Sequence, residues 1–347
     1  MADSPQVAVL GAGSIGCFVG GAWSAAGIDV TFVGREAMQR EVAEHGITIT
    51  DYAGTRLHLP APSVRFFTSP QALVKADVIA LCVKSNATAS AAREIGRHAK
   101  KAATIISFQN GISNVDKLKS MLGRFEVLHG MVPFNVAHMG GGRFHKGVAG
   151  DLTAATAQNT AAIAHRVGDR LGRLRLRDDM KAVAWGKLLI NLNNAVNALS
   201  GRTLLEQLKE RDYRRVVAAS IVEALKVLEI GGIEPAKIGP IAPNLLPHAI
   251  GAPNLVFNNL FLKIQKIDSN ARSSMADDLA AGRETEIDFL NGEIVRLGRA
   301  LGLKTPVNSA IVELVKQREA GVEHLWGPED LRKYVLEGHR GVAIFGY

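Results

Sequence analysis

The sequence predicts an α/β domain followed by an all-helical domain. Short apolar runs alternate with helical patterns through the first half of the chain, and such strand-like runs become scarce after Asp179. Alternating strands and helices favour a parallel sheet covered by helices. A length of 347 residues also exceeds one typical domain. We therefore predict two domains, residues 1–180 and residues 181–347.

The first apolar run, Val7–Leu10, leads directly into a Gly-x-Gly-x-x-Gly turn, and an Ala-rich helical pattern then extends to Ala26. In such a turn the first glycine permits the tight bend, the second lets a pyrophosphate approach the backbone, and the third lets the helix pack on the strand. Unpaired N–H groups and the helix dipole favour phosphate there. The pattern predicts a Rossmann-type dinucleotide-binding domain. Its cofactor-binding turn is Gly11, Ala12, Gly13, Ser14, Ile15 and Gly16.

The end of the second predicted strand, Asp29–Val33, is where such a domain selects its cofactor. An acidic residue there would bind the ribose 2′-hydroxyl of NAD, whereas an arginine can pair with the 2′-phosphate of NADP. The strand is followed by Gly34 and Arg35, which favours NADP. Glu36, one residue further on, keeps NAD open as the alternative.

Two later strands also end in polar residues. Asp77–Val83 is followed by Lys84, and Ala103–Phe108 is followed by Gln109 and Asn110. Ligands of open α/β sheets sit beyond the carboxyl ends of the strands, so Lys84 and Asn110 are candidates to face the cofactor. The alternatives are a solvated lysine and a tight Asn-Gly turn.

The rest of the first domain is predicted from extended and helical patterns. The expected elements are a hairpin of Ile47–Thr50 and Thr55–Leu59, extended segments Val127–Ala137 and Arg143–Ala155, a helix Thr160–Leu171, and an exposed edge strand Arg173–Arg177.

One helix of the second domain carries polar residues in an apolar setting. Trp185–Asn197 reads as a single helix, on which Lys187, Asn191 and Asn194 share one face. A helix that is apolar almost all round should be buried, and a lysine on it is then costly unless it is paired or functional. The alternative is a lysine whose ammonium reaches the surface.

Further helices follow, and we expect them over Arg202–Ile230, in a long helix opened by Glu286 and Asp288, and in a last helix over roughly Val307–Arg318. The polar run Asp268–Met275 reads as a helix-capping segment. The tail, residues 322–347, has no assigned role.

Composition excludes several other classes of protein. The longest apolar runs fall short of the ~20 residues that span a bilayer, and the first residues lack a signal-peptide pattern, so we expect a cytoplasmic protein without a membrane partner. Two cysteines, Cys17 and Cys82, favour neither disulfides nor a metal site. The net charge of +8 is spread along the chain, which suits an acidic cofactor and substrate better than a nucleic acid.

Taken together, these motifs resemble the ketopantoate reductases (2-dehydropantoate 2-reductases) over roughly residues 7–320. The resemblance rests on the glycine turn, Val83-Lys84, Gln109-Asn110-Gly111 and Trp185-x-Lys187-Leu188 with Asn191. Ser273-Ser274-Met275 and Arg283-x-Thr285-Glu286-Ile287-Asp288-x-x-Asn291-Gly292 complete it.

The resemblance implies hydride transfer from NADPH to the 2-oxo group of ketopantoate, giving pantoate for pantothenate synthesis. It implies that Lys187 is the general acid, with Glu286 as the acid beside the cofactor and the lysine. Asn110 would contact nicotinamide and substrate, Lys84 the cofactor, and Asn191 and Ser274 the substrate. An ammonium can protonate the alkoxide that hydride transfer leaves behind, which agrees with these roles. A helical second domain also suits a homodimer.

The sequence departs from the family at one place. The family's second helix asparagine would fall at Ala195, and the run supplies Asn193, Asn194 and Asn197 instead. Asn194 has the better angular position, and Asn197 begins an Asn-Ala-Leu-Ser stretch like the family's Asn-Pro-Leu-Thr. Either a helix irregularity or an altered substrate pocket would explain the offset. Reduction of another branched or aromatic 2-oxo acid, and a non-catalytic NADP sensor, are the alternative functions.

Overall fold

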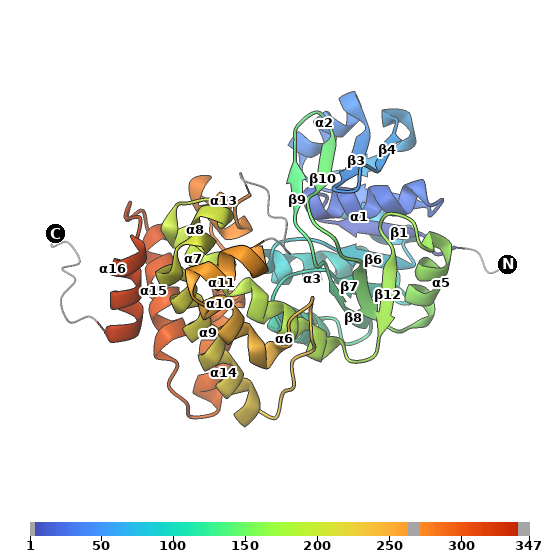
Figure 1. The fold of residues 1–347 in the computed structure, drawn as a ribbon. Coiled ribbons are helices and arrows are strands. Elements are labelled where there is room, and N and C mark those ends of the chain that lie inside the picture. The colour runs from blue at the N-terminus through green and yellow to red at the C-terminus, as the bar shows by residue number, and fades with distance from the viewer. Residues whose placement is uncertain (1–3, 263–270, 339–347) are drawn as a thin grey trace. The chain divides into compact units, whose positions relative to one another are not determined.

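The computed structural model describes residues 4–262 and 271–338 and divides the chain into two compact units, 1–181 and 182–347 (Figure 1). The first unit is α/β and the described part of the second is helical, which confirms the predicted fold class.

The first unit is built on an eight-stranded sheet with the order β12-β11-β8-β7-β6-β1-β2-β5. From β5 to β8 all neighbours run parallel, in the order of a doubly wound dinucleotide-binding sheet. β11 runs antiparallel to β8, and β12 forms the edge predicted for the arginine-rich strand. The strands are β1 Val7–Leu10, β2 Val30–Val33, β5 Arg65–Phe67, β6 Val78–Leu81, β7 Thr104–Ser107, β8 Glu126–Met131, β11 Leu152–Ala155 and β12 Leu174–Arg177.

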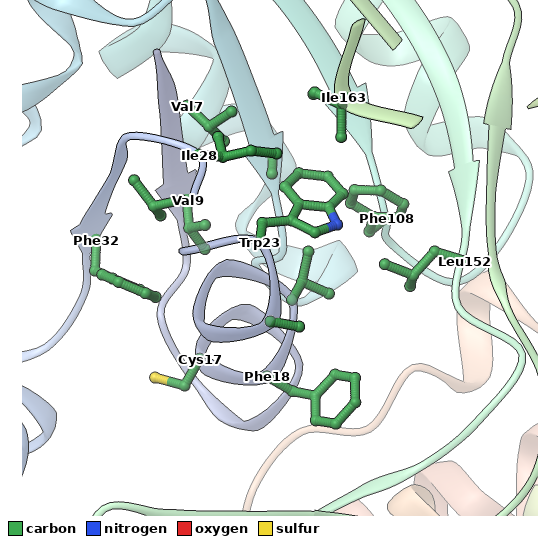
Figure 2. Close-up of a cluster of buried hydrophobic side chains, with 14 of the residues drawn as sticks. Val7, Val9, Cys17, Phe18, Trp23, Ile28, Phe32, Phe108, Leu152 and Ile163 are labelled. Carbon is green, nitrogen blue, oxygen red and sulfur yellow. The ribbon is translucent and has the colours of Figure 1, made fainter. Parts of the chain in front are cut away.

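Helices bury both faces of this sheet. Val7 and Val9 face one core, which contains Trp23 of α1 (Figure 2). Ala8 and Leu10 face the other core. This alternation explains why β1 reads as a continuous apolar run, as strands of covered parallel sheets do. The helices of this unit are α1 Ser14–Ala25, α2 Glu36–His45, α3 Thr88–His98, α4 Ser113–Met121 and α5 Gln158–Val167.

A second sheet, with the order β4-β3-β10-β9, also packs on α1. A side chain at Gly21 of α1 would meet Ile49 Cδ1 at 2.6 Å, so the glycine lets this sheet approach the helix closely. The predicted hairpin is present as two of these strands. The four are β3 Ile47–Asp51, β4 Arg56–Leu59, β9 Val136–His138 and β10 Arg143–Lys146.

The described part of the second unit consists of helices and turns, and its long central helix α9 packs against α10, α15 and α16. The helices are α6 Met180–Asn191, α7 Asn193–Ser200, α8 Leu204–Lys209, α9 Arg211–Ile230, α10 Leu246–Gly251, α11 Asn254–Val256, α13 Ser274–Ala280, α14 Asn291–Ala300, α15 Pro306–Glu319 and α16 Pro328–Arg332. Within the described ranges, none of the chain's helices has both the length and the apolar character that a membrane span needs.

The prediction of one helix over Trp185–Asn197 is wrong. α6 ends at Asn191, and α7 begins at Asn193 after a turn at Leu192. The interruption is one residue long, because Leu192 keeps helical angles, φ −58° and ψ −23°, and its N–H donates to the carbonyl of Leu188 at 3.1 Å. Lys187 and Asn191 therefore share α6, whereas Asn194 belongs to α7.

Two further helix predictions need correction. Glu286 and Asp288 do not open a long helix: Glu286 precedes a single 3₁₀ turn, Ile287–Phe289, and α14 begins only at Asn291. Leu290, with φ −116° and ψ −96°, separates the two. The helix over α15 is present, but it is not the last, because α16 and a π-helical turn, Lys333–Glu337, follow it.

Candidate functional site

The residues predicted to hold a dinucleotide lie along one edge of the main sheet. Strands β2, β1, β6 and β7 are consecutive neighbours, with Leu10 paired to both Val33 and Leu81, and Leu81 paired to Ser107. Their carboxyl ends lead into Arg35, the glycine turn, Lys84 and Asn110, in that order. This is the edge at which open α/β sheets bind ligands.

The three glycines of the turn differ in what surrounds them. Gly11 has φ +98°, and a Cβ on it would lie 2.6 Å from Val83 N. A Cβ on Gly16 would lie 2.4 Å from the carbonyl oxygen of Gly11, so this glycine allows close packing of α1 on the turn. Around Gly13, no atom of the described residues lies within 4 Å of the Cβ position, apart from the glycine and its chain neighbours.

The start of α1 fits a phosphate group. Gly11 N–H and Ala12 N–H donate to the carbonyl of Val33 at 2.9 and 3.0 Å, which fixes the turn to the end of β2. The first turn of α1 contains no acidic residue, and first-turn N–H groups have no intrahelical acceptor. Together with the open space over Gly13, these donors suit the pyrophosphate of a dinucleotide.

The end of β2 has no room for the acidic side chain that would recognise NAD. A Cβ on Gly34 would lie 2.8 Å from the Phe66 ring and 3.0 Å from Ala12 Cβ. Arg35 begins α2 as its N-cap residue and is exposed. Glu36, the residue that kept NAD open, pairs with Arg40 one helical turn further on at 3.2 Å.

A buried polar network, which the sequence interpretation missed, joins the loops after β6 and β7. Asn114 Nδ2 donates to the carbonyl of Asn110 at 2.6 Å and to Ser85 Oγ at 2.9 Å. Thr88 Oγ1 donates to Asn114 Oδ1 at 2.8 Å, and Ser85 Oγ donates to the carbonyl of Asn110 at 3.1 Å. Ser85, Thr88 and Asn114 are at most 2% exposed. The network fixes the backbone that carries Lys84 and Asn110.

Gln109 extends this network toward the strand. Its Nε2 donates to Thr88 Oγ1 at 2.8 Å, and its Oε1 accepts from Ser107 Oγ at 3.0 Å. Polar residues directly after buried strands were the available signal in the sequence, but their pairing partners lie on other loops.

In the second unit, Lys187 is a partly buried lysine among apolar residues of α6. Trp185, Leu188 and Leu189 of α6 are buried, although Ile190 is 38% exposed. Gly186 lets the helix approach the chain at Ala236, whose carbonyl oxygen would lie 2.1 Å from a Cβ there. Burial lowers the pKa of Lys187 from 10.5 to about 8. Asn191, one turn along the same helix, is also buried.

The asparagines of α7 have different surroundings from one another. Asn197 is fully buried; its Nδ2 donates to the carbonyl of Arg202 at 3.0 Å, and its Oδ1 accepts from Ser273 N at 2.9 Å. Ser273 Oγ donates to the carbonyl of Asn194 at 3.0 Å and caps α13. Asn194 is half-buried, and Ser274, the first residue of α13, is exposed. Of the expected capping segment, residues 268–270 lie outside the described residues.

The half-buried Glu286 lies in a backbone segment that its neighbours hold firmly. Thr285 donates from both N and Oγ1 to Glu319 Oε1 at 2.7 Å, and Lys316 pairs with both Glu319 and Asp288. Burial would raise the pKa of Glu319, but the hydrogen bonds from Lys316 and Thr285 lower it below its ordinary value. A charged Glu319 thus anchors the segment before the 3₁₀ turn.

Neither cysteine has the character of a redox or metal site. Both Cys17 and Cys82 are free thiols, and burial raises the pKa of Cys82 to about 12. Burial raises the pKa of Cys17 as well. Across residues 4–262 and 271–338, no group of three or more His, Cys, Asp or Glu side chains is placed to hold a metal ion.

Comparison with known proteins assigns the family. Residues 7–159 match the family model described as ketopantoate reductase PanE/ApbA, and residues 179–319 match its C-terminal model. The chain belongs to this family. Ketopantoate reductase family members are oxidoreductases, so the chain is an enzyme of that class and uses a nicotinamide dinucleotide as its cofactor.

Individual relatives of this ketopantoate reductase family member align over nearly their whole length. A 2-dehydropantoate 2-reductase of Halobacterium salinarum is 27% identical over 90% of this chain and 98% of its own. The crystal structure of a PanE/ApbA family ketopantoate reductase from Ralstonia eutropha has a TM-score of 0.77 and 28% identity, covering 92% of this chain and all of that one. D-mandelate dehydrogenase, solved with NADH and anilino(oxo)acetate, shares the fold with a TM-score of 0.73 and 21% identity.

Proposed function

We propose that the enzyme reduces 2-dehydropantoate to pantoate with NADPH, as a step of pantothenate biosynthesis. Family membership and full-length similarity to a reductase of this name support the substrate. The observation that carries the chemistry is the partly buried Lys187, whose pKa burial lowers to about 8.

Lys187 would act as the general acid. Reduction of a ketone leaves negative charge on its oxygen, which must be protonated or held electrostatically as it forms. With a pKa of about 8, the side chain remains mostly charged at neutral pH and yet gives up its proton more readily than an ordinary lysine. Glu286, held in place through Thr285, would orient the ammonium and offset its charge.

The first unit would hold the cofactor, and a bound NADPH would supply the hydride. The glycine turn and the start of α1 would bind the pyrophosphate. Arg35 would pair with the 2′-phosphate of NADPH through its guanidinium group. Gly34 leaves no room for an acidic side chain, which would bind the ribose 2′-hydroxyl of NAD instead. Lys84 and Asn110, fixed by the buried network, would contact the nicotinamide end of the cofactor, with Asn110 also reaching the substrate.

The second unit would supply the remaining substrate contacts. Asn191 on α6 and Ser274 at the start of α13 offer an amide and a hydroxyl for the carboxylate and hydroxyl groups of the substrate. Asn194 is the third candidate. Asn197 is not, because both ends of its buried amide are already engaged by Arg202 and Ser273.

The test is 2-oxo-acid-dependent oxidation of NADPH, measured by loss of its absorbance, with NADH in parallel. We expect kcat/KM to be highest for 2-dehydropantoate and NADPH. A higher kcat/KM for another branched or aromatic 2-oxo acid would show that this acid, and not 2-dehydropantoate, is the substrate. NADPH binding without turnover of any member of the panel would indicate a sensor.

A further inference from the structure

The chain continues beyond the part that matches the family, and this extension packs closely. The family match ends at residue 319, but Trp326, Leu331 and Tyr334 are at most 5% exposed. The rings of Trp326 and Tyr334 lie 4.9 Å apart, and α16 packs on α9. The described extension is therefore part of the helical core.

The extension binds to the end of α7. Trp326 N–H donates to the carbonyl of Leu199 at 3.0 Å, and its own carbonyl accepts from Tyr213 Oη of α9 at 2.6 Å. Leu325 lies against Gly201, where a Cβ would meet its side chain at 2.8 Å. Gly201 has φ +65°, which ends α7 and turns the chain toward Arg202. Contacts with Leu325 and Trp326 of the extension therefore fix the end of α7 and the turn that follows it.

The same turn is connected to the start of α13. Arg202 receives a hydrogen bond from Asn197 on its carbonyl, and Asn197 in turn accepts from Ser273 N–H. Ser273 then bonds the carbonyl of Asn194 and caps the helix that begins with Ser274. Contacts therefore continue from Leu325 and Trp326 to the backbone of Ser273.

We propose that Asn197 is a positioning residue and that the extension, residues 325–334, supports it, so that together they set the place of Ser274 and Asn194 for the substrate. This rests on the proposed function, in which those two residues contact the 2-oxo acid. The fully buried Asn197 reaches the substrate only through Ser273. Its amide satisfies one backbone donor and one backbone acceptor, and removing either bond leaves a buried polar group unpaired.

The test compares Asn197→Asp, which keeps the acceptor for Ser273 N–H but cannot donate to Arg202, with Tyr213→Phe, which removes only the bond to Trp326. Leu325→Ala removes the contact with Gly201. Glu329→Gln is the matched control, because Glu329 is exposed on α16 and pairs with the exposed Lys333. For each variant, kcat, KM for 2-dehydropantoate, Kd for NADPH and hydrogen exchange of the α13 amides are measured.

We expect the first three variants to raise KM about three- to tenfold while leaving Kd for NADPH unchanged, and to speed exchange at Ser273 and Ala276. The control should match the wild type. Lower thermal stability with unchanged KM and unchanged exchange would show that the extension only stabilises the fold, and would overturn the proposal. A wild type inactive on every 2-oxo acid would instead refute the proposed function, and the exchange data would then decide the positioning role alone.

Discussion

Asn114 Nδ2 lies 2.6 Å from the carbonyl oxygen of Asn110, so the second residue of α4 holds the loop that follows β7. Asn114 is 2% exposed, and the same nitrogen also reaches Ser85 in the loop after β6. Two neighbouring loops therefore share one buried donor.

We predict that Asn114→Asp weakens NADPH binding and lowers kcat, each by about tenfold. Aspartate keeps the acceptor for Thr88 but cannot donate to Asn110, and it adds an unpaired buried charge. NADPH titration and steady-state kinetics would measure the effect. Ser120→Ala on the same helix is the control, because Ser120 is exposed and donates to the carbonyl of Lys117 within its own helix. Unchanged Kd and kcat in Asn114→Asp would show that the network does not position Asn110.

Two glycines of the turn should have different roles, one in NADPH binding and the other in the stability of the fold. We predict that Gly13→Ala weakens NADPH binding with little change in thermal stability, because the new methyl enters open space where the pyrophosphate would approach. Gly16→Ala should lower the melting temperature, because its methyl would lie 2.4 Å from the carbonyl oxygen of Gly11. Thermal unfolding without ligand, followed by NADPH titration, checks both. Equal affinity of Gly13→Ala and the wild type would place the phosphates elsewhere.

The sequence predicts this edge of the sheet well because its signals are local. Apolar runs ending in Gly11, Lys84 and Asn110 mark strand ends, and parallel strands bring their ends to one edge. The spacing of the glycines also determines the geometry of the turn between β1 and α1, which is only a few residues long. Such features need no knowledge of distant partners.

The parts that the sequence did not predict depend on distant contacts. Ser85 and Asn114 are 29 residues apart, and nothing in either segment indicates the other. The role of Asn197 follows from Ser273, 76 residues away, and the burial of the extension follows from Tyr213, 113 residues from Trp326. The interruption at Leu192 is a single residue, and an angular count along one helix passes over it.

Cofactor preference should depend on Arg35 and on the space at Gly34. We predict that Arg35→Ala weakens NADPH binding by one to two orders of magnitude, with a far smaller effect on NADH, since only NADPH carries the 2′-phosphate. Gly34→Asp should lower stability without producing an NADH-specific enzyme, because its Cβ would lie 2.8 Å from the Phe66 ring. Kd values for both cofactors check this. Equal losses for NADPH and NADH in Arg35→Ala would show that Arg35 does not recognise the 2′-phosphate.

The pKa of Lys187 gives the proposed mechanism a pH signature. The acid form is the active one, so kcat/KM should fall as pH rises through about 8, rather than near 10.5 where an ordinary lysine loses its proton. Lys187→Met, which keeps the apolar packing, should lower kcat by about 10²–10⁴-fold and leave NADPH binding nearly intact. The residual activity of this variant should lack the alkaline decline.

The lowered pKa of Lys187 also predicts that stability rises with pH, whereas kcat/KM falls. Because the folded pKa lies below the unfolded one, the unfolded chain binds more protons between about pH 8 and 10.5, and the Lys187 contribution to stability rises with pH across that window. Lys187→Met should therefore gain stability relative to the wild type below pH 8, and this gain should shrink toward pH 10.5. Chemical unfolding at several pH values measures it. A difference in stability independent of pH, together with an unaltered kcat, would mean that Lys187 is neither desolvated nor the proton donor.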